Sequence, residues 1–239
     1  MMDVSHYSSK KKHLLTDFDK TLRLVNDVFT RRFGQEQTID LMDQARKEYE
    51  EIIPSIPYIG GKQPFTQFII STAWSLSMYR VLKSIGTPVE EIGKLTFEAS
   101  AKYVGESPEY IKRILGFLTF TSSFRRRLQR RAEESHRREY PGDYVFNYIE
   151  GDGIDFDYGV DYLECASCKF LESQDAIELA PYLCTADIPY SETLNWGLIR
   201  TKTLAEGYSH CDFRFKKGGE THVAVPKDIE SFIERHRSR

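Results

Sequence analysis

The apolar residues of this chain change their spacing near Pro141 and Gly142, and this change limits the fold more than any other feature of the sequence. Upstream, apolar residues recur at steps of three and four, which places them on one face of a helix. The first such series comprises Leu14, Phe18, Leu22, Val25 and Phe29. Downstream, large apolar residues recur at every second position, which is typical of strands. The two alternating series are Tyr144, Phe146 and Tyr148, and then Phe156, Tyr158, Val160 and Tyr162.

These two patterns predict the order of the secondary structure. The helical pattern runs from about residue 10 to residue 138 and is interrupted by a proline- and glycine-rich loop at residues 53–65; its last helix is predicted as one piece from residue 109 onward. Two hairpins are predicted next, with turns at residues 151–153 and 206–207, the second joining strands at 197–204 and 209–216. A helix over residues 226–237 closes the chain. We therefore predict an α+β fold, in which a helical region (residues 1–140) packs on an antiparallel sheet region (residues 141–239) as one integrated domain.

The composition argues against several classes of function. The 239 residues carry a formal net charge of −3, so no overall positive charge favours nucleic acid. No apolar run reaches the roughly 18–20 residues that cross a bilayer, and the first residues, MMDVSHYSSKKKHLL, lack the apolar stretch of a secretory signal. We therefore expect a cytoplasmic protein with reduced thiols that acts on a small molecule and binds neither nucleic acid nor membrane. The apolar N-terminal helices make a homodimer the expected oligomeric state.

An arginine-rich stretch ends the helical half, with six arginines between Arg125 and Arg137. Glutamates at positions 133, 134 and 139 interleave with its later part, and this mixture is typical of a solvent-exposed helix end. The alternative is a surface that binds a partner protein. In that case charge reversal at Arg125, Arg126 and Arg127 would weaken partner binding.

All four cysteines fall between residues 165 and 211, which indicates a metal site, a disulfide or reactive thiols. They are Cys165, Cys168, Cys184 and Cys211. A reducing compartment argues against a disulfide. A structural zinc site normally has two closely spaced pairs, whereas the last two cysteines here lie 27 residues apart, and the first pair lies at a predicted strand-to-helix transition without a shaping glycine or proline. Small buried hydrophobes and a nucleophilic thiolate remain as interpretations, and we expect neither a metal nor another cofactor.

The residues around each cysteine favour Cys184 as the nucleophile. His210 precedes Cys211 directly on a predicted strand, so the two side chains point to opposite faces and cannot form a catalytic pair. Cys211 shares its face with two phenylalanines, which predicts a packed and inert thiol. Asp187 follows Cys184 by three residues, on the same face of a helical turn, where its carboxylate can accept a proton or orient water.

Two stretches of the second half carry an ordered series of motifs. They read ELAPYLCTAD at residues 178–187 and IRTKTLAEGYSHCDFRF at residues 199–215, and a strand ending in Cys165 precedes them. With IPYIGGKQPFT at residues 56–66 and MYRVLKSIGTPVEEIG at residues 78–93, they resemble the L-2-amino-thiazoline-4-carboxylic acid hydrolase family. The resemblance covers about residues 20–217 and includes a Cys-x-x-Asp element and an Arg-Thr-x-Thr strand. It aligns the first with Cys184 and Asp187, and the second with Arg200.

The resemblance implies a hydrolase that opens a small cyclic amidine or imide at a non-peptide carbon–nitrogen bond, with a cysteine nucleophile. A fainter similarity links the chain to four-vinyl-reductase-type small-molecule-binding domains, some of which hold zinc through a Glu-x-x-Cys element. Arg200 and Thr203 stand at the corresponding positions here, so two zinc ligands are missing. The missing ligands argue against zinc. A non-catalytic sensor domain on the same scaffold, which binds a small molecule or a metal, is the alternative function.

We expect the substrate to bind between the loop at residues 53–65 and the elements that carry Cys184 and Cys211. The two glycines of this loop would let backbone N–H groups approach the reacting carbon, and the lysine after them would meet a substrate carboxylate. Cys165 is expected to be buried and structural. The predicted substrate-binding residues are Gly60, Gly61, Lys62, Arg200, Cys211 and Asp212.

Overall fold

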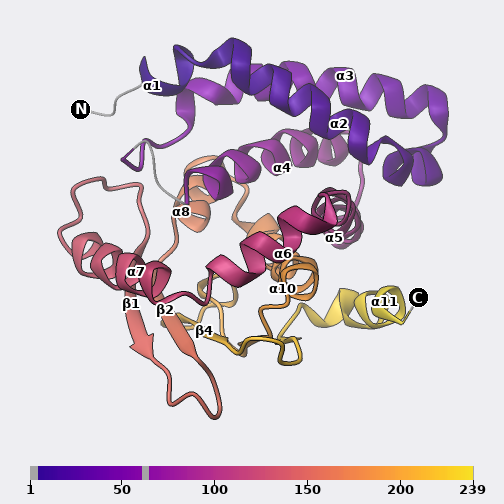
Figure 1. Ribbon diagram of the computed structural model, residues 1–239. Helices are drawn as coiled ribbons and strands as arrows, with labels where there is room; N and C mark the ends of the chain where they lie inside the picture. Colours follow the sequence, from indigo (N-terminus) through magenta and orange to yellow (C-terminus); the bar gives the residue numbers. More distant parts are fainter. Residues whose placement is uncertain (1–4, 61–64, 239) are drawn as a thin grey trace.

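Helices form the N-terminal half of the chain, and the strands gather at the opposite end of the molecule (Figure 1). The computed structural model describes residues 5–60 and 65–238. Within these ranges no helix is long and apolar enough to cross a bilayer. The helices of this half, and the short 3₁₀ turn after the third of them, are α1 (Ser5–Ser8), α2 (Lys11–Phe33), α3 (Gln35–Ile52), η1 (Ile53–Ser55), α4 (Thr66–Ser84), α5 (Val89–Gly105), α6 (Glu109–Leu118) and α7 (Ser122–Ser135).

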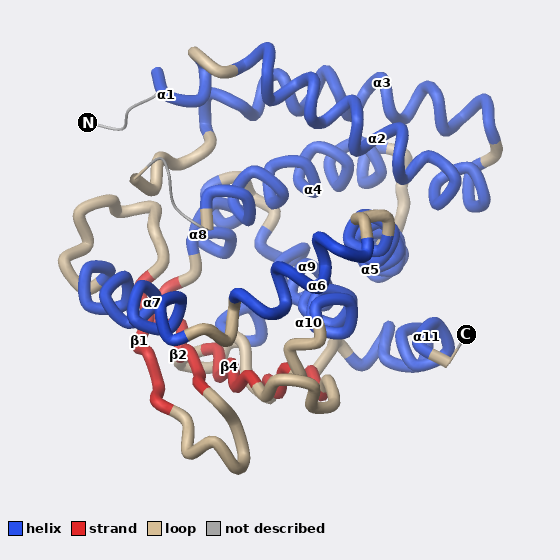
Figure 2. The backbone as a smooth tube through the Cα atoms, in the orientation of Figure 1, coloured by secondary structure: helices blue, strands red, loops and turns tan. Residues whose placement is uncertain are grey.

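The second half contains a five-stranded mixed sheet and four further helices (Figure 2). Its strands are β1 (Val145–Glu150), β2 (Tyr158–Glu164), β3 (Leu198–Arg200), β4 (Cys211–Phe215) and β5 (His222–Val223), in the spatial order β1-β2-β4-β3-β5. Every pairing is antiparallel except that of β3 with β5. The helical segments are α8 (Ala166–Ser173), η2 (Ile177–Leu179), α9 (Ala180–Leu183), η3 (Cys184–Ala186), α10 (Asp187–Leu194), η4 (Leu204–Glu206) and α11 (Lys227–Arg237). The predicted α+β class is confirmed.

One hydrophobic core joins the helical half to the first hairpin. The apolar series predicted for the first helix is buried on α2, so the three-and-four spacing correctly identified its inner face. Phe65, at the start of α4, packs edge-on against Phe146 of β1 with ring centroids 5.4 Å apart. A second cluster of buried side chains attaches the C-terminal helix α11 to α5, α9 and α10. Its members are Phe97, Tyr182, Ile188, Ile229 and Ile233.

Two predicted elements differ in the structure. The helix predicted as one piece from residue 109 is broken into α6 and α7, because Thr121 adopts an extended conformation and its hydroxyl accepts a hydrogen bond from the Phe124 N–H, which starts a new helix. The strand predicted to reach Leu204 ends at Arg200, since Thr203 caps the short turn η4 in the same way. Both predicted hairpins are present, and both threonine caps are local interactions that hydrophobic periodicity does not encode.

Gly197 connects α10 to β3 in a left-handed conformation, with φ at 54°, and a Cβ there would overlap backbone atoms of Lys216 and Gly219. We expect Gly197→Ala to lower the free energy of unfolding by about 2–4 kcal/mol, from backbone strain and overpacking together. Gly207→Ala is the matched control, because Gly207 also has a positive φ, at 85°, but no atom lies within 4 Å of the place that a Cβ would take. Chemical denaturation of both variants measures the difference. Equal losses would contradict the crowding at Gly197.

Candidate active site

Cys165 lies at the junction of β2 and α8, where it is the N-cap residue of the helix. Its backbone is extended, and its carbonyl accepts the first intrahelical hydrogen bond, from the Lys169 N–H at 3.0 Å. The Cys168 thiol donates toward the Cys165 sulfur and, against the opposing effect of burial, lowers the pKa of Cys165 to about 7. The N–H groups of Cys168 and Ser167 at the start of α8 stabilise the thiolate further. Cys165 is therefore the thiol of this chain that ionises near neutral pH.

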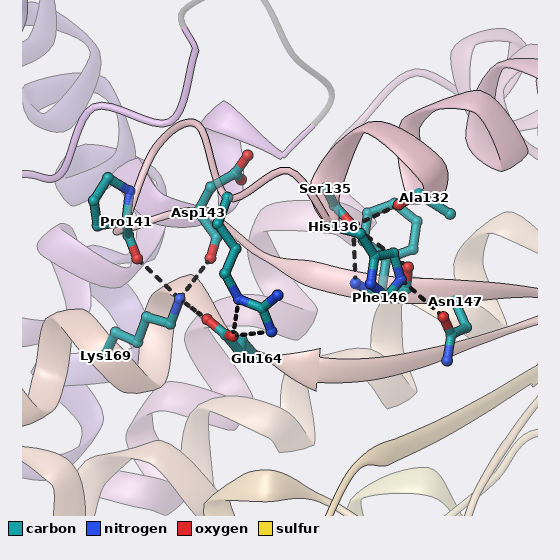
Figure 3. A network of polar contacts seen from close by, with 10 residues as sticks. Ala132, Ser135, His136, Pro141, Asp143, Phe146, Asn147, Glu164 and Lys169 are labelled. Carbon is teal, nitrogen blue, oxygen red and sulfur yellow. Dashed lines mark hydrogen bonds and ion pairs between the residues drawn. The ribbon is translucent and has the colours of Figure 1, made fainter.

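Polar contacts hold the end of β2 to α8 (Figure 3). Lys169 of α8 forms an ion pair with Glu164, the last residue of β2. The Lys169 ammonium also donates to the carbonyl oxygens of Pro141 and Asp143, at 2.9 and 3.0 Å. These contacts tie the first part of α8 to the segment that precedes β1.

Ser167 ties the same turn to the helical half of the molecule. Its hydroxyl lies 2.8 Å from the Thr72 hydroxyl of α4 and 3.2 Å from the Tyr144 hydroxyl. Tyr144 and Tyr162 both lie close enough to Cys165 for the charge of a thiolate to raise their pKa values, although burial is the larger cause. Both tyrosines contact the ring of Phe65, with centroids 5.2 and 6.2 Å away. Phe65, the last residue of the 53–65 loop, thus packs against the two tyrosines near Cys165.

Arg200, at the end of β3, is buried and faces the segment that contains Cys184 and Asp187. One of its terminal nitrogens, Nη2, donates to the carbonyl oxygens of Cys184 at 3.3 Å and Ala224 at 3.0 Å. The other, Nη1, lies 3.5 Å from the Asp187 carboxylate. Neither Nη1 nor Nε has a hydrogen-bond partner in the part of the chain that the structure describes. Buried donors left without an acceptor cost free energy, and the nearby Asp187 carboxylate offsets part of that cost at Nη1.

Asp187 is the first residue of α10, and its carboxylate lies among the thiols. Burial raises its pKa, and the nearby Arg200 charge offsets part of that rise. The Asp187 charge in turn raises the pKa values of Cys165, Cys184 and Cys211. A carboxyl group with a raised pKa close to a thiolate is suited to proton transfer.

The thiols of Cys184 and Cys211 are held in their neutral form. Burial is the main cause that raises the pKa of Cys184 far above its ordinary value, and Arg200 offsets only part of it. Burial also raises the pKa of Cys211 to about 12, although its sulfur accepts a hydrogen bond from the Leu204 N–H at 3.2 Å. The packed, inert state predicted for Cys211 is consistent with this finding. The electrostatics give no such support to Cys184 as a thiolate, so its role as nucleophile stays a prediction.

We call this group the thiol site. Its members are Cys165, Cys168, Cys184, Asp187, Arg200 and Cys211. Across the described ranges, no three histidine, cysteine, aspartate or glutamate side chains are arranged to hold a metal ion. Two cavities of about 370 Å³ each occur elsewhere, one among α1, α2, α4 and α5 and one beside α10 and α11. No cysteine lines either of them, so neither corresponds to the pocket predicted from the sequence.

The remaining predicted site residues have different surroundings in the structure. Arg200 forms an ion pair with Asp187, and its predicted contact with a substrate stays a prediction. Gly60 has a positive φ of 95°, which explains glycine at that position without a ligand. Asp212 accepts hydrogen bonds from the N–H groups of Thr201 and Lys202, at 2.8 and 2.7 Å, which lower its pKa. Its side chain is therefore engaged in holding the turn after β3. Gly61 and Lys62 lie outside the described residues.

Sequence reasoning assigned Cys165 a buried, structural role. Its side chain is partly buried and packs against the hydrophobic core, and its pKa is lowered, so the structural role stays a prediction beside that of a reactive thiol. The signal that would have identified it is present in the sequence, since a Cys-x-x-Cys element at a strand-to-helix transition places its first thiol at the N-terminus of a helix.

One comparison with known proteins identifies the family of this chain. A sequence model of the L-2-amino-thiazoline-4-carboxylic acid hydrolase family matches residues 67–215, which is more than half of the 239 residues. The chain therefore belongs to this family, whose name describes a hydrolase. The matched segment contains every member of the thiol site and excludes the loop at residues 53–65 up to Phe65. No curated protein and no solved structure gives a significant match.

Proposed function

We propose that this protein is a hydrolase that opens a small cyclic amidine bearing a carboxylate, of the thiazoline-carboxylate type, and that Cys165 is its nucleophile. The observation that supports this most strongly is the place of Cys165 at the N-cap of α8, where its pKa is lowered, within the segment that matches the family. A thiolate present at neutral pH needs no separate base to attack an electrophilic carbon.

The chemistry follows from the groups of the thiol site. The Cys165 sulfur would add to the amidine carbon and form a tetrahedral adduct, and the N–H groups at the start of α8 would stabilise charge near the sulfur. Asp187 would give a proton to the ring atom that leaves, which opens the ring at a carbon–nitrogen bond. The resulting carboxylate of Asp187 would then take a proton from water as the water attacks the adduct and releases Cys165.

Arg200 would bind the substrate carboxylate. Its Nη1 has no hydrogen-bond partner in the described part of the chain and could donate to a carboxylate oxygen, and charge-assisted hydrogen bonds of this kind are among the strong ones in proteins. The positive charge of Arg200 would also offset the negative charge of the bound substrate carboxylate. The preference for a carboxylate-bearing substrate is therefore attributed to one side chain.

The test compares L-2-amino-thiazoline-4-carboxylate with 2-amino-thiazoline, which lacks the carboxylate. The protein is expected to hydrolyse the acid with a kcat/KM at least about 100-fold higher, since a charge-assisted contact contributes roughly 1.5–3 kcal/mol. Product formation is followed by liquid chromatography and mass spectrometry. Equal turnover of both compounds would contradict the role of Arg200, and no turnover of either would contradict the proposed substrate class.

The reactivity of Cys165 should depend on pH with a midpoint of about 7, because its pKa is lowered to about 7. As the pH rises through this value, the thiolate fraction increases and alkylation by iodoacetamide should accelerate to a plateau. Cys184, whose pKa is raised, should react only at much higher pH. Peptide-resolved mass spectrometry measures both rates in one sample. Faster labelling of Cys184 than of Cys165 at neutral pH would contradict the assignment of the thiolate.

A further inference from the structure

Cys165 and Cys168 occupy the N-cap and N3 positions of α8. In helices these two positions face each other, since an N-cap side chain approaches the N3 backbone and an N3 side chain reaches back toward the N-cap. Free cysteines occupy both of these positions. The backbone of the first turn of α8 therefore places the two side chains on the same side of the helix start.

The pair also has the unequal reactivity that thiol–disulfide exchange requires. Cys165 ionises readily, whereas contact with the Cys165 sulfur is the main cause that raises the pKa of Cys168, which keeps its proton. Cys165, Cys168 and Cys184 are partly buried and Cys211 is buried. Cys168 is the only other cysteine in the first turn of α8, which makes it the natural second thiol for Cys165.

We propose that Cys165 and Cys168 form a reversible disulfide by exchange with a low-molecular-weight disulfide, so that the start of α8 is a site of thiol oxidation as well as a site of hydrolysis. Exchange is favoured when the attacking thiol has a pKa near the ambient pH and the second thiol is held close to it. A single thiol suffices for a covalent nucleophile. The exchange gives the second cysteine, at N3, a role of its own.

The reaction balances with oxidised glutathione as the oxidant. The Cys165 thiolate attacks one sulfur of oxidised glutathione, so a mixed disulfide forms, the glutathione disulfide breaks and one glutathione thiolate leaves. The Cys168 sulfur then attacks the Cys165 sulfur; the protein disulfide forms, the mixed disulfide breaks, and the second glutathione leaves with the proton from Cys168. Two protein thiols are oxidised by two electrons, and one oxidised glutathione becomes two reduced ones.

Peptide mass mapping tests the inference, because trypsin separates the thiols. Cys165 and Cys168 share the peptide 139–169, whereas Cys184 lies in 170–200 and Cys211 in 203–214. The full-length protein is treated with oxidised glutathione, quenched with acid and alkylated. We expect the peptide 139–169 to lose two hydrogen atoms and both alkylation sites, and to regain them after dithiothreitol. Two alkylated cysteines in this peptide, or a disulfide that links it to another peptide, would overturn the inference.

Two variants make the result specific. Cys168→Ser should stop at the first step and retain one glutathione on the peptide 139–169, because no second thiol can displace it. Cys184→Ser should still form the disulfide, since Cys184 lies outside α8. Loss of the disulfide in Cys184→Ser, or no bound glutathione in Cys168→Ser, would overturn the assignment of the pair.

Formation of the disulfide should also stop turnover of the substrate. This expectation rests on the proposed function, because it assumes that Cys165 is the nucleophile. The disulfide is measured by mass and needs no substrate. A protein that forms the disulfide but hydrolyses no thiazoline carboxylate would refute the proposed function alone. A protein that hydrolyses the compound but forms no such disulfide would refute this inference alone.

Discussion

Replacement of Cys165 by serine is expected to lower kcat/KM for thiazoline-carboxylate hydrolysis by roughly 1000-fold or more, while the protein stays folded. A serine hydroxyl is not ionised near neutral pH, so the attacking thiolate is lost, and loss of a nucleophile commonly has effects of this size or larger. Serine is also a preferred N-cap residue, so α8 should keep its first turn. Steady-state kinetics and thermal unfolding of the variant check both parts.

Cys184→Ser is the comparison that decides between the two candidate nucleophiles. We expect it to retain far more activity than Cys165→Ser, because the pKa of Cys184 is raised and its thiol is held neutral. If Cys184→Ser loses more activity than Cys165→Ser, the nucleophile is Cys184, as the Cys-x-x-Asp motif suggested. Equal and small losses in both variants would contradict a cysteine nucleophile at either position.

Replacement of Arg200 by leucine should reduce both stability and substrate selectivity. The change removes the donors to the carbonyl oxygens of Cys184 and Ala224 and leaves Asp187 without its cation. Loss of one partner of a fully buried ion pair costs about 3–5 kcal/mol; the Asp187 side chain is 32% exposed, so we expect a smaller loss of roughly 2–4 kcal/mol in the free energy of unfolding. The preference for the carboxylate-bearing substrate should disappear.

Arg214→Leu is the matched control for this variant. Arg214 pairs with Asp161 at 2.7 Å between neighbouring strands of the same sheet, and both side chains are a quarter exposed or less. It should lose stability without changing the preference for a carboxylate. Arg200→Lys keeps the charge and should retain the fold, but it lacks the planar pair of donors. Unchanged selectivity in Arg200→Lys and Arg200→Leu would contradict a carboxylate contact at this position.

The fold class could be predicted because it depends on hydrophobic spacing. The series from Leu14 to Phe29 has a helical period and the series from Tyr144 to Tyr148 has a strand period, and each period identifies the buried face directly. The break between α6 and α7 could not be predicted in this way. It depends on the hydroxyl of Thr121, a single local contact in a sequence that otherwise reads as one helix.

The site was predicted in part. The motifs identified Cys184, Asp187 and Arg200, which the fold brings together although they belong to three different elements, η3, α10 and β3. The difference between Cys184 and Cys165 could not be read from spacing, since it arises from burial at one thiol and from helix-start donors at the other. The raised pKa of Asp187 has the same origin, because burial exists only in the folded chain.

The most direct test of a Cys165 nucleophile is to trap the covalent adduct during turnover. The protein is mixed with thiazoline carboxylate, quenched with acid within the steady state, digested with trypsin and analysed by mass spectrometry. We predict an added substrate mass on the peptide 139–169, which fragmentation places on Cys165, and no added mass on 170–200 or 203–214. An adduct on Cys184 in the peptide 170–200 would contradict a nucleophile at the start of α8.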